Sequence, residues 1–276
     1  MTLSKRNIFF KAGIACCALS VLYIAAVSFI AIPVYSSLSV ESLPRPAGFF
    51  QMIAGRWLNP NFYSVHISIA ILSLYSLITL CLILRFFEQT QSPEILFIAF
   101  FVISLTCEPA RLILPLQREY GIPSVYILLA ARIVLFSRYF GLFSLFAASL
   151  YAAGMEPQKQ RMFIFIVAIS SLSIALGTPI DSFSWSANFN TIYGYSMIFR
   201  LLNGVILLMT VISFLIAAHL RASREYIFIG IGIFLVVAGR SMLLNTDTWT
   251  ALPGILPLSF GAWFICNYLH KVYLWL

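Results

Sequence analysis

The sequence predicts an all-α protein, a polytopic integral membrane helical bundle with about eight transmembrane helices. Of its 276 residues, 61% are hydrophobic and only 9% are charged, whereas soluble domains carry about 25% charged residues. Several apolar runs reach the ~20 residues that an α-helix needs to cross the hydrocarbon core of a bilayer. The alternating ten-residue strands of a transmembrane β-barrel are absent from the sequence. These three observations define the fold class.

The first apolar run, at residues 10–35, follows basic residues at the N-terminus. It is longer than the 7–15-residue core of a signal peptide, so we interpret it as a retained helix. The remaining spans are expected at residues 64–86, 95–116, 123–150, 162–180, 192–217, 226–244 and 253–272. Short polar or turn-rich links such as FEQTQSPE, GMEPQKQR and LRASRE separate them. Residues 1–276 are therefore expected to form a single transmembrane domain.

The distribution of lysine and arginine predicts the orientation of the chain. With the N-terminus in the cytoplasm, nine basic residues lie on the cytoplasmic side, three lie outside and five lie within the spans. Cytoplasmic loops of membrane proteins carry such an excess of Lys and Arg, which also accounts for the net charge of +8. Both termini are predicted to be cytoplasmic, which requires an even number of spans.

The longest link, residues 37–63, is expected on the extracytoplasmic side. Within it, the sequence PAGFFQMIAGRWLNPN places Phe50, Ile53 and Trp57 on one side of a short helix. Apolar and aromatic side chains at that spacing suit a helix that lies in the headgroup region. An irregular loop with scattered aromatic residues is the alternative.

Ionisable residues inside the spans are the candidate functional residues. A charge at the centre of a bilayer costs at least ~2.5–3.5 kcal/mol on insertion scales, so such residues usually face the bundle interior or a wet cavity. They come from five helices and gather in the predicted extracytoplasmic half of the bundle. With the polar Asn203, one turn after Arg200, the candidate ligand-binding residues are Glu108, Arg111, Arg132, Arg138, Asp181, Arg200, Asn203 and Arg240.

The stretch SLTCEPARLILPL shows how these charges are arranged. Glu108 and Arg111 are three residues apart, so they share one helical face and can pair. Pro109 lacks a backbone N–H and bends the span, which would widen a pocket at its outer end. Five arginines and two carboxylates leave an excess of positive charge. Because guanidinium binds carboxylate or phosphate bidentately, we expect an outer pocket that recognises an anionic group.

Two other interpretations compete with this pocket. The charges can form interhelical ion pairs that hold the bundle together without a ligand. Some arginines, Arg132 and Arg200 in particular, can also extend toward the outer headgroups, because long basic side chains reach the interface from helix ends.

Several chemistries find no support in the sequence. Mid-span histidine pairs for haem and a mid-span lysine for retinal are missing, and hydrolase, zinc-protease and nucleotide-binding motifs do not occur. We therefore expect no metal and no cofactor, and we identify no catalytic residue. The five cysteines form no C-x-x-C pair or Cys/His cluster, so we expect neither a zinc site nor a disulfide framework.

The sequence thus favours a multi-pass protein of the cytoplasmic membrane that is not an enzyme and recognises an anionic ligand as a sensor, a receptor or a small transporter. The alternative is a membrane enzyme acting on a lipid-linked phosphate at the outer leaflet. Expected partners are the lipid bilayer, an anionic small molecule or lipid phosphate, and a cytoplasmic or membrane protein, whereas nucleic acid is not expected.

Overall fold

The computed structural model describes residues 3–36, 59, 61–88, 90, 92–245 and 248–274. Within these ranges, eight helical segments are long and apolar enough to cross a membrane, which confirms the predicted all-α membrane fold. The spans consist of α1 (Leu3–Tyr35), α3 (Phe62–Phe87), α4 (Pro93–Ser104) continued by the 3₁₀ helix η2 (Leu105–Ile113), α6 (Ser124–Ala152), α7 (Gln160–Gly177), α8 (Ser196–Leu220), α9 (Glu225–Asn245) and α10 (Ile255–Leu274). The interfacial helix expected within residues 37–63 lies outside the described residues.

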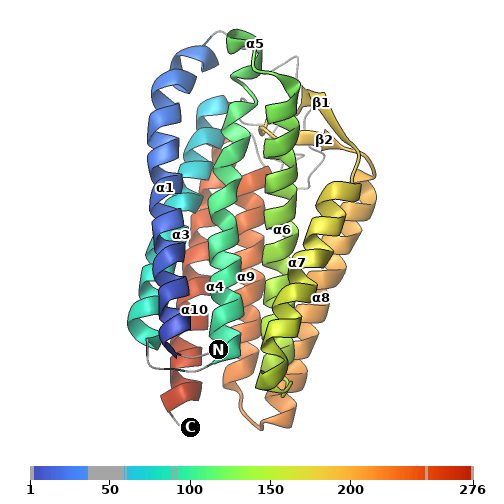
Figure 1. The fold of residues 1–276 in the computed structure, drawn as a ribbon. Helices are drawn as coiled ribbons and strands as arrows, with labels where there is room; N and C mark the ends of the chain where they lie inside the picture. The colour runs from blue at the N-terminus through green and yellow to red at the C-terminus, as the bar shows by residue number, and fades with distance from the viewer. Residues whose placement is uncertain are drawn as a thin grey trace.

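The two ends of the bundle differ (Figure 1). α1 begins and α10 ends at one of them, which we call the terminal end. The other end carries the short helix α5 (Gln117–Tyr120) and an antiparallel pair of strands, β1 (Ile180–Trp185) and β2 (Thr191–Tyr193), and we call it the hairpin end. The shared location of the two termini agrees with an even number of spans. That the terminal end faces the cytoplasm is still a prediction from the charge distribution.

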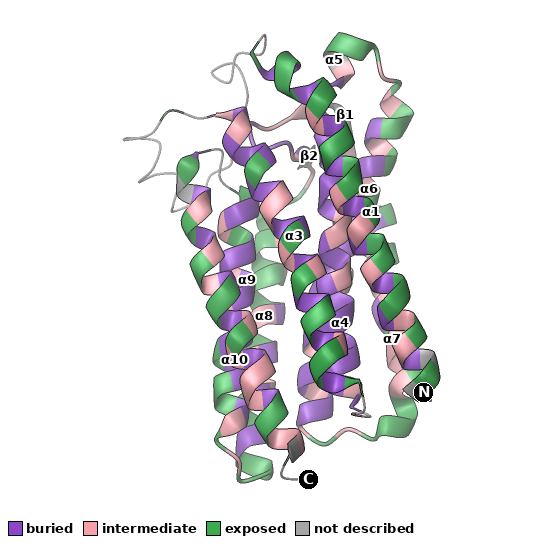
Figure 2. Ribbon diagram, turned by 90° about the vertical axis from the view of Figure 1, so that its left-hand side faces the viewer, coloured by how far each residue is buried: buried purple, intermediate pink, exposed green. Residues whose placement is uncertain are grey.

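Burial divides the helices into a central and a peripheral group. In the span formed by α4 and η2, 78% of the most apolar 18-residue stretch is buried, whereas in the span that contains α7 the corresponding share is 17%. α6 and α9 are also central, whereas α1, α8 and α10 are largely exposed. Figure 2 shows buried residues turned toward the bundle interior and exposed residues on the outward faces. A charged side chain on the inward face of α4, η2, α6 or α9 is therefore enclosed by protein.

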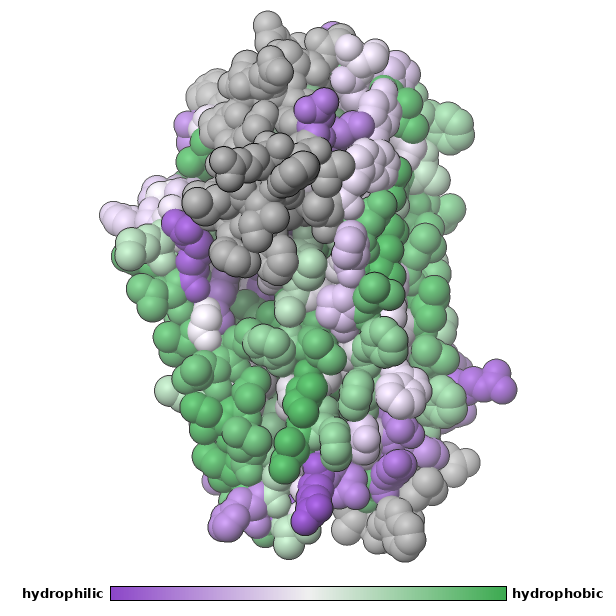
Figure 3. All heavy atoms as spheres, turned by 180° about the vertical axis from the view of Figure 1, so that it is seen from behind, coloured by the Kyte–Doolittle hydropathy of each residue, from purple (hydrophilic) through white to green (hydrophobic). Residues whose placement is uncertain are grey.

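The outer surface fits a bilayer. Large apolar side chains such as Phe29, Phe165 and Leu208 are exposed on peripheral helices, where a soluble protein would carry polar residues. In the view of Figure 3, hydrophobic atoms form a band around the middle of the molecule, and hydrophilic atoms gather toward its two ends. Lipid would cover this band.

Local sequence explains where several helices begin and end. Asn61 accepts a hydrogen bond from the Tyr63 N–H at 2.9 Å and so caps α3, and Pro93 occupies the first turn of α4, where its missing N–H costs nothing. α7 ends at Gly177, ahead of Pro179. The spans predicted to end at 180 and to begin at 192 therefore extended too far, because those residues belong to the β1–β2 hairpin.

Glycines allow α9 and α10 to pack at very short range. A Cβ atom on Gly239 would lie 2.7 Å from the backbone nitrogen of Leu258, and one on Gly261 would lie 2.6 Å from the carbonyl oxygen of Gly232. Small residues at helix interfaces let backbones approach closely, which drives association in membranes. This contact holds α9, and the functional residues on it, in a defined position.

The third span changes geometry at the residues that the sequence analysis selected. α4 gives way to η2 at Leu105, and Pro109 lies within η2. Proline cannot donate the backbone hydrogen bond of an α-helix, and 3₁₀ segments within longer helices often mark strain or function. The predicted distortion at Pro109 is present as a 3₁₀ helix of nine residues.

Candidate functional site: a buried arginine cluster beside a cavity

Glu108 lies at the centre of a buried ionic cluster near the hairpin end. Its side chain is fully buried, and Arg138 of α6 donates to it through two 2.8 Å hydrogen bonds, from Nε to Oε1 and from Nη2 to Oε2. Arg240 of α9 donates to Oε1 at 3.3 Å. Bidentate guanidinium–carboxylate pairing is the strongest geometry for such a bond. One carboxylate thus links η2, α6 and α9.

Arg111 completes the cluster from the same 3₁₀ helix as Glu108. Residues three apart lie on one side of a 3₁₀ helix, and Arg111 Nε is 3.8 Å from Glu108 Oε2, an ion pair without a hydrogen bond. The predicted pairing of these two residues is therefore present, but Arg138 is the closer partner of Glu108. Arg111 Nη1 instead donates to Asn190 Oδ1 at 2.8 Å and to the Leu244 carbonyl at 3.3 Å.

The β1–β2 hairpin supplies an uncharged partner to the cluster. Asn190 Oδ1 accepts 2.8 Å hydrogen bonds from both Arg111 and Arg138. The turn is held by Phe189, which is fully buried and stacks on Phe62 of α3 with 5.4 Å between ring centroids. Phe189 has a φ of 58°, a conformation uncommon outside glycine. Burial of its ring stabilises this turn and positions Asn190.

The described part of the cluster carries more positive than negative charge. Three guanidinium groups, those of Arg111, Arg138 and Arg240, surround one carboxylate. Among the described residues, Nε and Nη2 of Arg111 and Nε of Arg240 are buried and have no hydrogen-bond partner. Buried donors without partners cost free energy, about 1–3 kcal/mol or more for charged groups. These guanidinium donors are therefore left without an acceptor among the described residues.

A cavity of about 250 Å³ adjoins the cluster between α6, α8 and α9. Arg138 and Arg240 reach it, and Arg138 keeps 17% of its side chain exposed. Leucine and valine side chains form the rest of its wall with Gly204 and three further polar residues, Asn203, Ser241 and Asn245. Glu108 does not line it, and neither does any other carboxylate of the described residues.

The structure brings together four of the predicted site residues, Glu108, Arg111, Arg138 and Arg240, and places Asn203 across the cavity from α9. Arg132 lies elsewhere: its Nη1 donates to the carbonyls of Ala175 and Leu176, both at 2.7 Å, and so caps the end of α7. Asp181 is exposed on β1, where it accepts a hydrogen bond from Ser184. Arg200 is exposed on α8, one turn from Asn203.

Two polar residues of the site, Asn190 and Asn245, were not predicted from the sequence. Asn190 belongs to a link between two spans, and only its position between two hairpin strands brings it onto the cluster. Asn245 is the last residue of α9 and lines the cavity. For Asn190, the available signal in the sequence was the polar stretch SANFNT, which follows Trp185.

A second polar cluster holds the terminal end of the bundle. Glu94 is 3% exposed, accepts a 2.8 Å hydrogen bond from Tyr273 Oη and lies 3.6 Å from Arg221 Nη2. Arg221 also donates to Tyr226 Oη at 2.6 Å. These contacts join the ends of α4, α8, α9 and α10, and we interpret them as structural.

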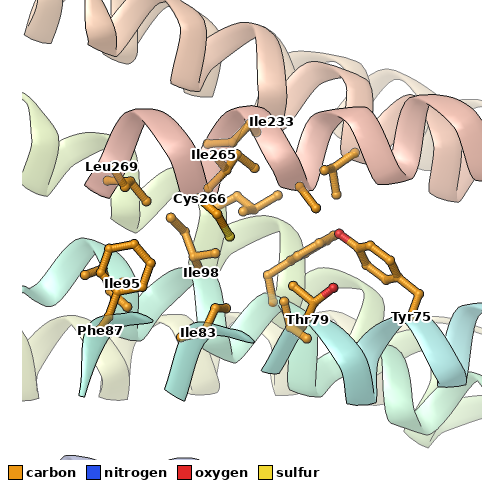
Figure 4. A pocket seen from close by; sticks show the side chains of 15 residues that line it. Tyr75, Thr79, Ile83, Phe87, Ile95, Ile98, Ile233, Ile265, Cys266 and Leu269 are labelled. Atoms are coloured by element: carbon orange, nitrogen blue, oxygen red, sulfur yellow. The ribbon is translucent and has the colours of Figure 1, made fainter. Parts of the chain in front are cut away.

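A small apolar cavity lies deeper, between α3, α4, α6, α9 and α10 (Figure 4). Its volume is about 20 Å³, little more than one water molecule requires. Isoleucine, leucine, valine and phenylalanine side chains form most of its wall, and Figure 4 shows Tyr75, Thr79 and Cys266 as polar or sulfur-bearing exceptions. This space is a packing defect and too small for a ligand.

The fold and the site define a multi-pass helical membrane protein with a buried arginine–glutamate cluster. No protein family matches the sequence, and no curated protein is similar to it. Its function is therefore inferred from the geometry of the site.

Proposed function

We propose that this protein binds an anionic group in the cavity between α6, α8 and α9 and acts as a receptor or sensor in the cytoplasmic membrane. The supporting observation is that Arg138 and Arg240 both reach the cavity while they share a single buried carboxylate. Guanidinium stays charged at any biological pH. An anion in the cavity would balance the excess positive charge of the described cluster and accept hydrogen bonds from Arg138 and Arg240, which line the cavity.

The lining of the cavity favours binding over catalysis. Hydrolysis of a phosphate ester needs a general base or a nucleophile close to the reacting atom. Glu108 is fully buried behind the guanidinium groups, and Ser241 is the only hydroxyl-bearing residue among the described lining residues. Asp181, the other carboxylate predicted for such a role, is exposed on β1. A lipid-phosphate enzyme remains the second candidate, and it would have to supply its base from elsewhere.

Recognition also fits better than transport. A transporter needs polar groups that lead from the cavity to the opposite side of the membrane. Toward the terminal end, α8 and α9 are in contact, since a Cβ atom on Gly230 would lie 3.2 Å from Phe214 Cβ. The interior next to α9 is apolar (Figure 4). A receptor of this kind would signal through a protein bound at the loops of the terminal end.

The test is anion binding by the purified protein, with inorganic phosphate and dioleoyl phosphatidic acid as probes. We expect Arg138→Gln to weaken binding at least tenfold, because the substitution removes a guanidinium that lines the cavity. Asn203→Leu should weaken it as well and, on an exposed helical face, should leave the fold intact. Arg85→Gln, which removes an exposed arginine at the end of α3, is the matched control and should bind normally.

Two results would overturn the proposal. One is the failure of the wild-type protein to bind either probe. The other is unchanged affinity in Asn203→Leu and in Arg138→Gln, which would leave the arginine cluster with a structural role alone.

A further inference from the structure

The cavity opens sideways, between two helices. α8 and α9 touch near the terminal end, at Gly230 and Phe214, and they separate toward the hairpin end (Figure 1). The cavity fills the space that this divergence creates, and Asn203 and Gly204 on α8 and Ser241 on α9 are exposed at its rim. A Cβ atom added to Gly204 would meet no atom of the described residues within 4 Å. No described residue therefore obstructs the opening at Gly204.

Exposed apolar side chains flank this opening on α8, together with Arg200, which lies one turn from Asn203. Positions 197, 201, 204 and 208 follow the spacing of one helical face. Met197 and Leu201 are 70% and 61% exposed on the hairpin side of Gly204, and Leu208 is 57% exposed on the other side. Such a face belongs in contact with hydrocarbon, so the opening lies within the apolar belt. What enters there comes from the bilayer.

The size of the cavity limits which part of a ligand it can hold. Clefts that enclose a drug-sized ligand have volumes of about 300–1,000 Å³, and this one has about 250 Å³. A compact anionic head group fits, but acyl chains do not. They would stay outside, against the apolar face of α8 that carries Leu201 and Leu208.

Charge narrows the choice of head group. The described cluster has three guanidinium groups and one carboxylate, an excess of two positive charges. A phosphate monoester carries about −1.5 to −2 at pH 7 and offers three acceptor oxygens. Asn203, Ser241 and Asn245 add uncharged donors around the same space. A phosphodiester or a carboxylate would neutralise only half of the excess.

We infer that the ligand of this cavity is a lipid with a phosphate monoester head group, which enters from the bilayer between α8 and α9 through the gap at Gly204. This inference rests on the proposed function and specifies its ligand. The head group binds at Arg138 and Arg240, while the acyl chains remain in the membrane.

The experiment compares three probes on the detergent-purified protein by native mass spectrometry and equilibrium binding. Dioleoyl phosphatidic acid carries the monoester, dioleoyl phosphatidylcholine carries the same chains without it, and inorganic phosphate lacks the chains. We expect phosphatidic acid to bind at least tenfold more tightly than either of the other two.

The Gly204→Phe variant tests whether the lipid enters the cavity between α8 and α9. The new ring would occupy the open space at the rim and should weaken phosphatidic acid binding at least tenfold. Gly177→Phe is the matched control, because this glycine of α7 also has nothing within 4 Å of an added Cβ and does not line the cavity. Gly177→Phe should bind phosphatidic acid as tightly as the wild-type protein does.

The outcomes separate the two proposals. If inorganic phosphate binds as tightly as phosphatidic acid, the lipid inference is wrong and the proposed anion recognition stands. If phosphatidylcholine binds equally well, the head-group assignment is wrong. Unchanged binding in Gly204→Phe overturns the route between α8 and α9. If none of the three probes binds, both proposals fail.

Discussion

Replacing Glu108 by glutamine removes the charge at the centre of the cluster while it keeps the shape of the side chain. In the native protein this carboxylate is fully buried and has guanidinium nitrogens at 2.8, 3.3 and 3.8 Å, from Arg138, Arg240 and Arg111. Removing one member of a buried ion pair costs about 3–5 kcal/mol, because the remaining charge is left uncompensated. Here three positive charges would remain, so we expect the upper part of that range.

This loss is measurable as a change in thermal stability. At about 2–4 °C per kcal/mol for chains of this size, Glu108→Gln should lower the Tm by ~10 °C or more. Unfolding can be followed in detergent with a thiol-reactive dye in a background that lacks the exposed Cys16 and Cys81, because Cys17 is buried in the folded protein. Glu156→Gln is the control: Glu156 pairs with Lys159 at 3.3 Å, but both side chains are more than half exposed. Exposed pairs contribute about 0–1 kcal/mol.

A charge-balanced double variant tests whether the loss of stability comes from uncompensated charge. Glu108→Gln combined with Arg138→Gln removes one charge of each sign, and it should be more stable than Glu108→Gln alone, because residues in one ionic network do not act additively. If Glu108→Gln shifts the Tm no more than Glu156→Gln does, Glu108 is not the buried centre of an ionic cluster and the reasoning is refuted.

Two further predictions concern packing and orientation. Gly239→Ala places a Cβ atom 2.7 Å from the backbone nitrogen of Leu258 on α10, so it should destabilise the protein by about 1–3 kcal/mol in thermal unfolding. Gly204→Ala, the same change where no described residue is near, should not, and equal effects would contradict the close α9–α10 contact. Reporter fusions should place the C-terminus in the cytoplasm and an insertion in the turn at 186–190 outside, as the Lys and Arg distribution requires; the reverse result would place the cavity in the cytoplasmic leaflet.

The sequence alone determined the membrane fold and the approximate position of the spans. Both follow from long apolar runs, since lipid requires each spanning segment to satisfy its own backbone hydrogen bonds. It also identified the four ionisable residues of the cluster, because an ionisable residue in an apolar run has few permitted environments. It selected Asp181 and Arg200 as well, which are exposed, and missed the buried Glu94. The 3₁₀ segment around Pro109 had a local cause and was expected as a distortion for that reason.

Only the tertiary structure decided which charges meet. Arg138 is 30 residues from Glu108 and yet is its closest partner, whereas Arg132, on the same helix, caps α7 instead. Hydropathy does not reveal this, because a helix in lipid is apolar on every side and its rotation about its axis leaves little periodic signal. Rotation and neighbours are set by packing, as at the glycines of α9 and α10. Asn190 joins the cluster for a similar reason: a hairpin closed by the burial of Phe189 carries it there.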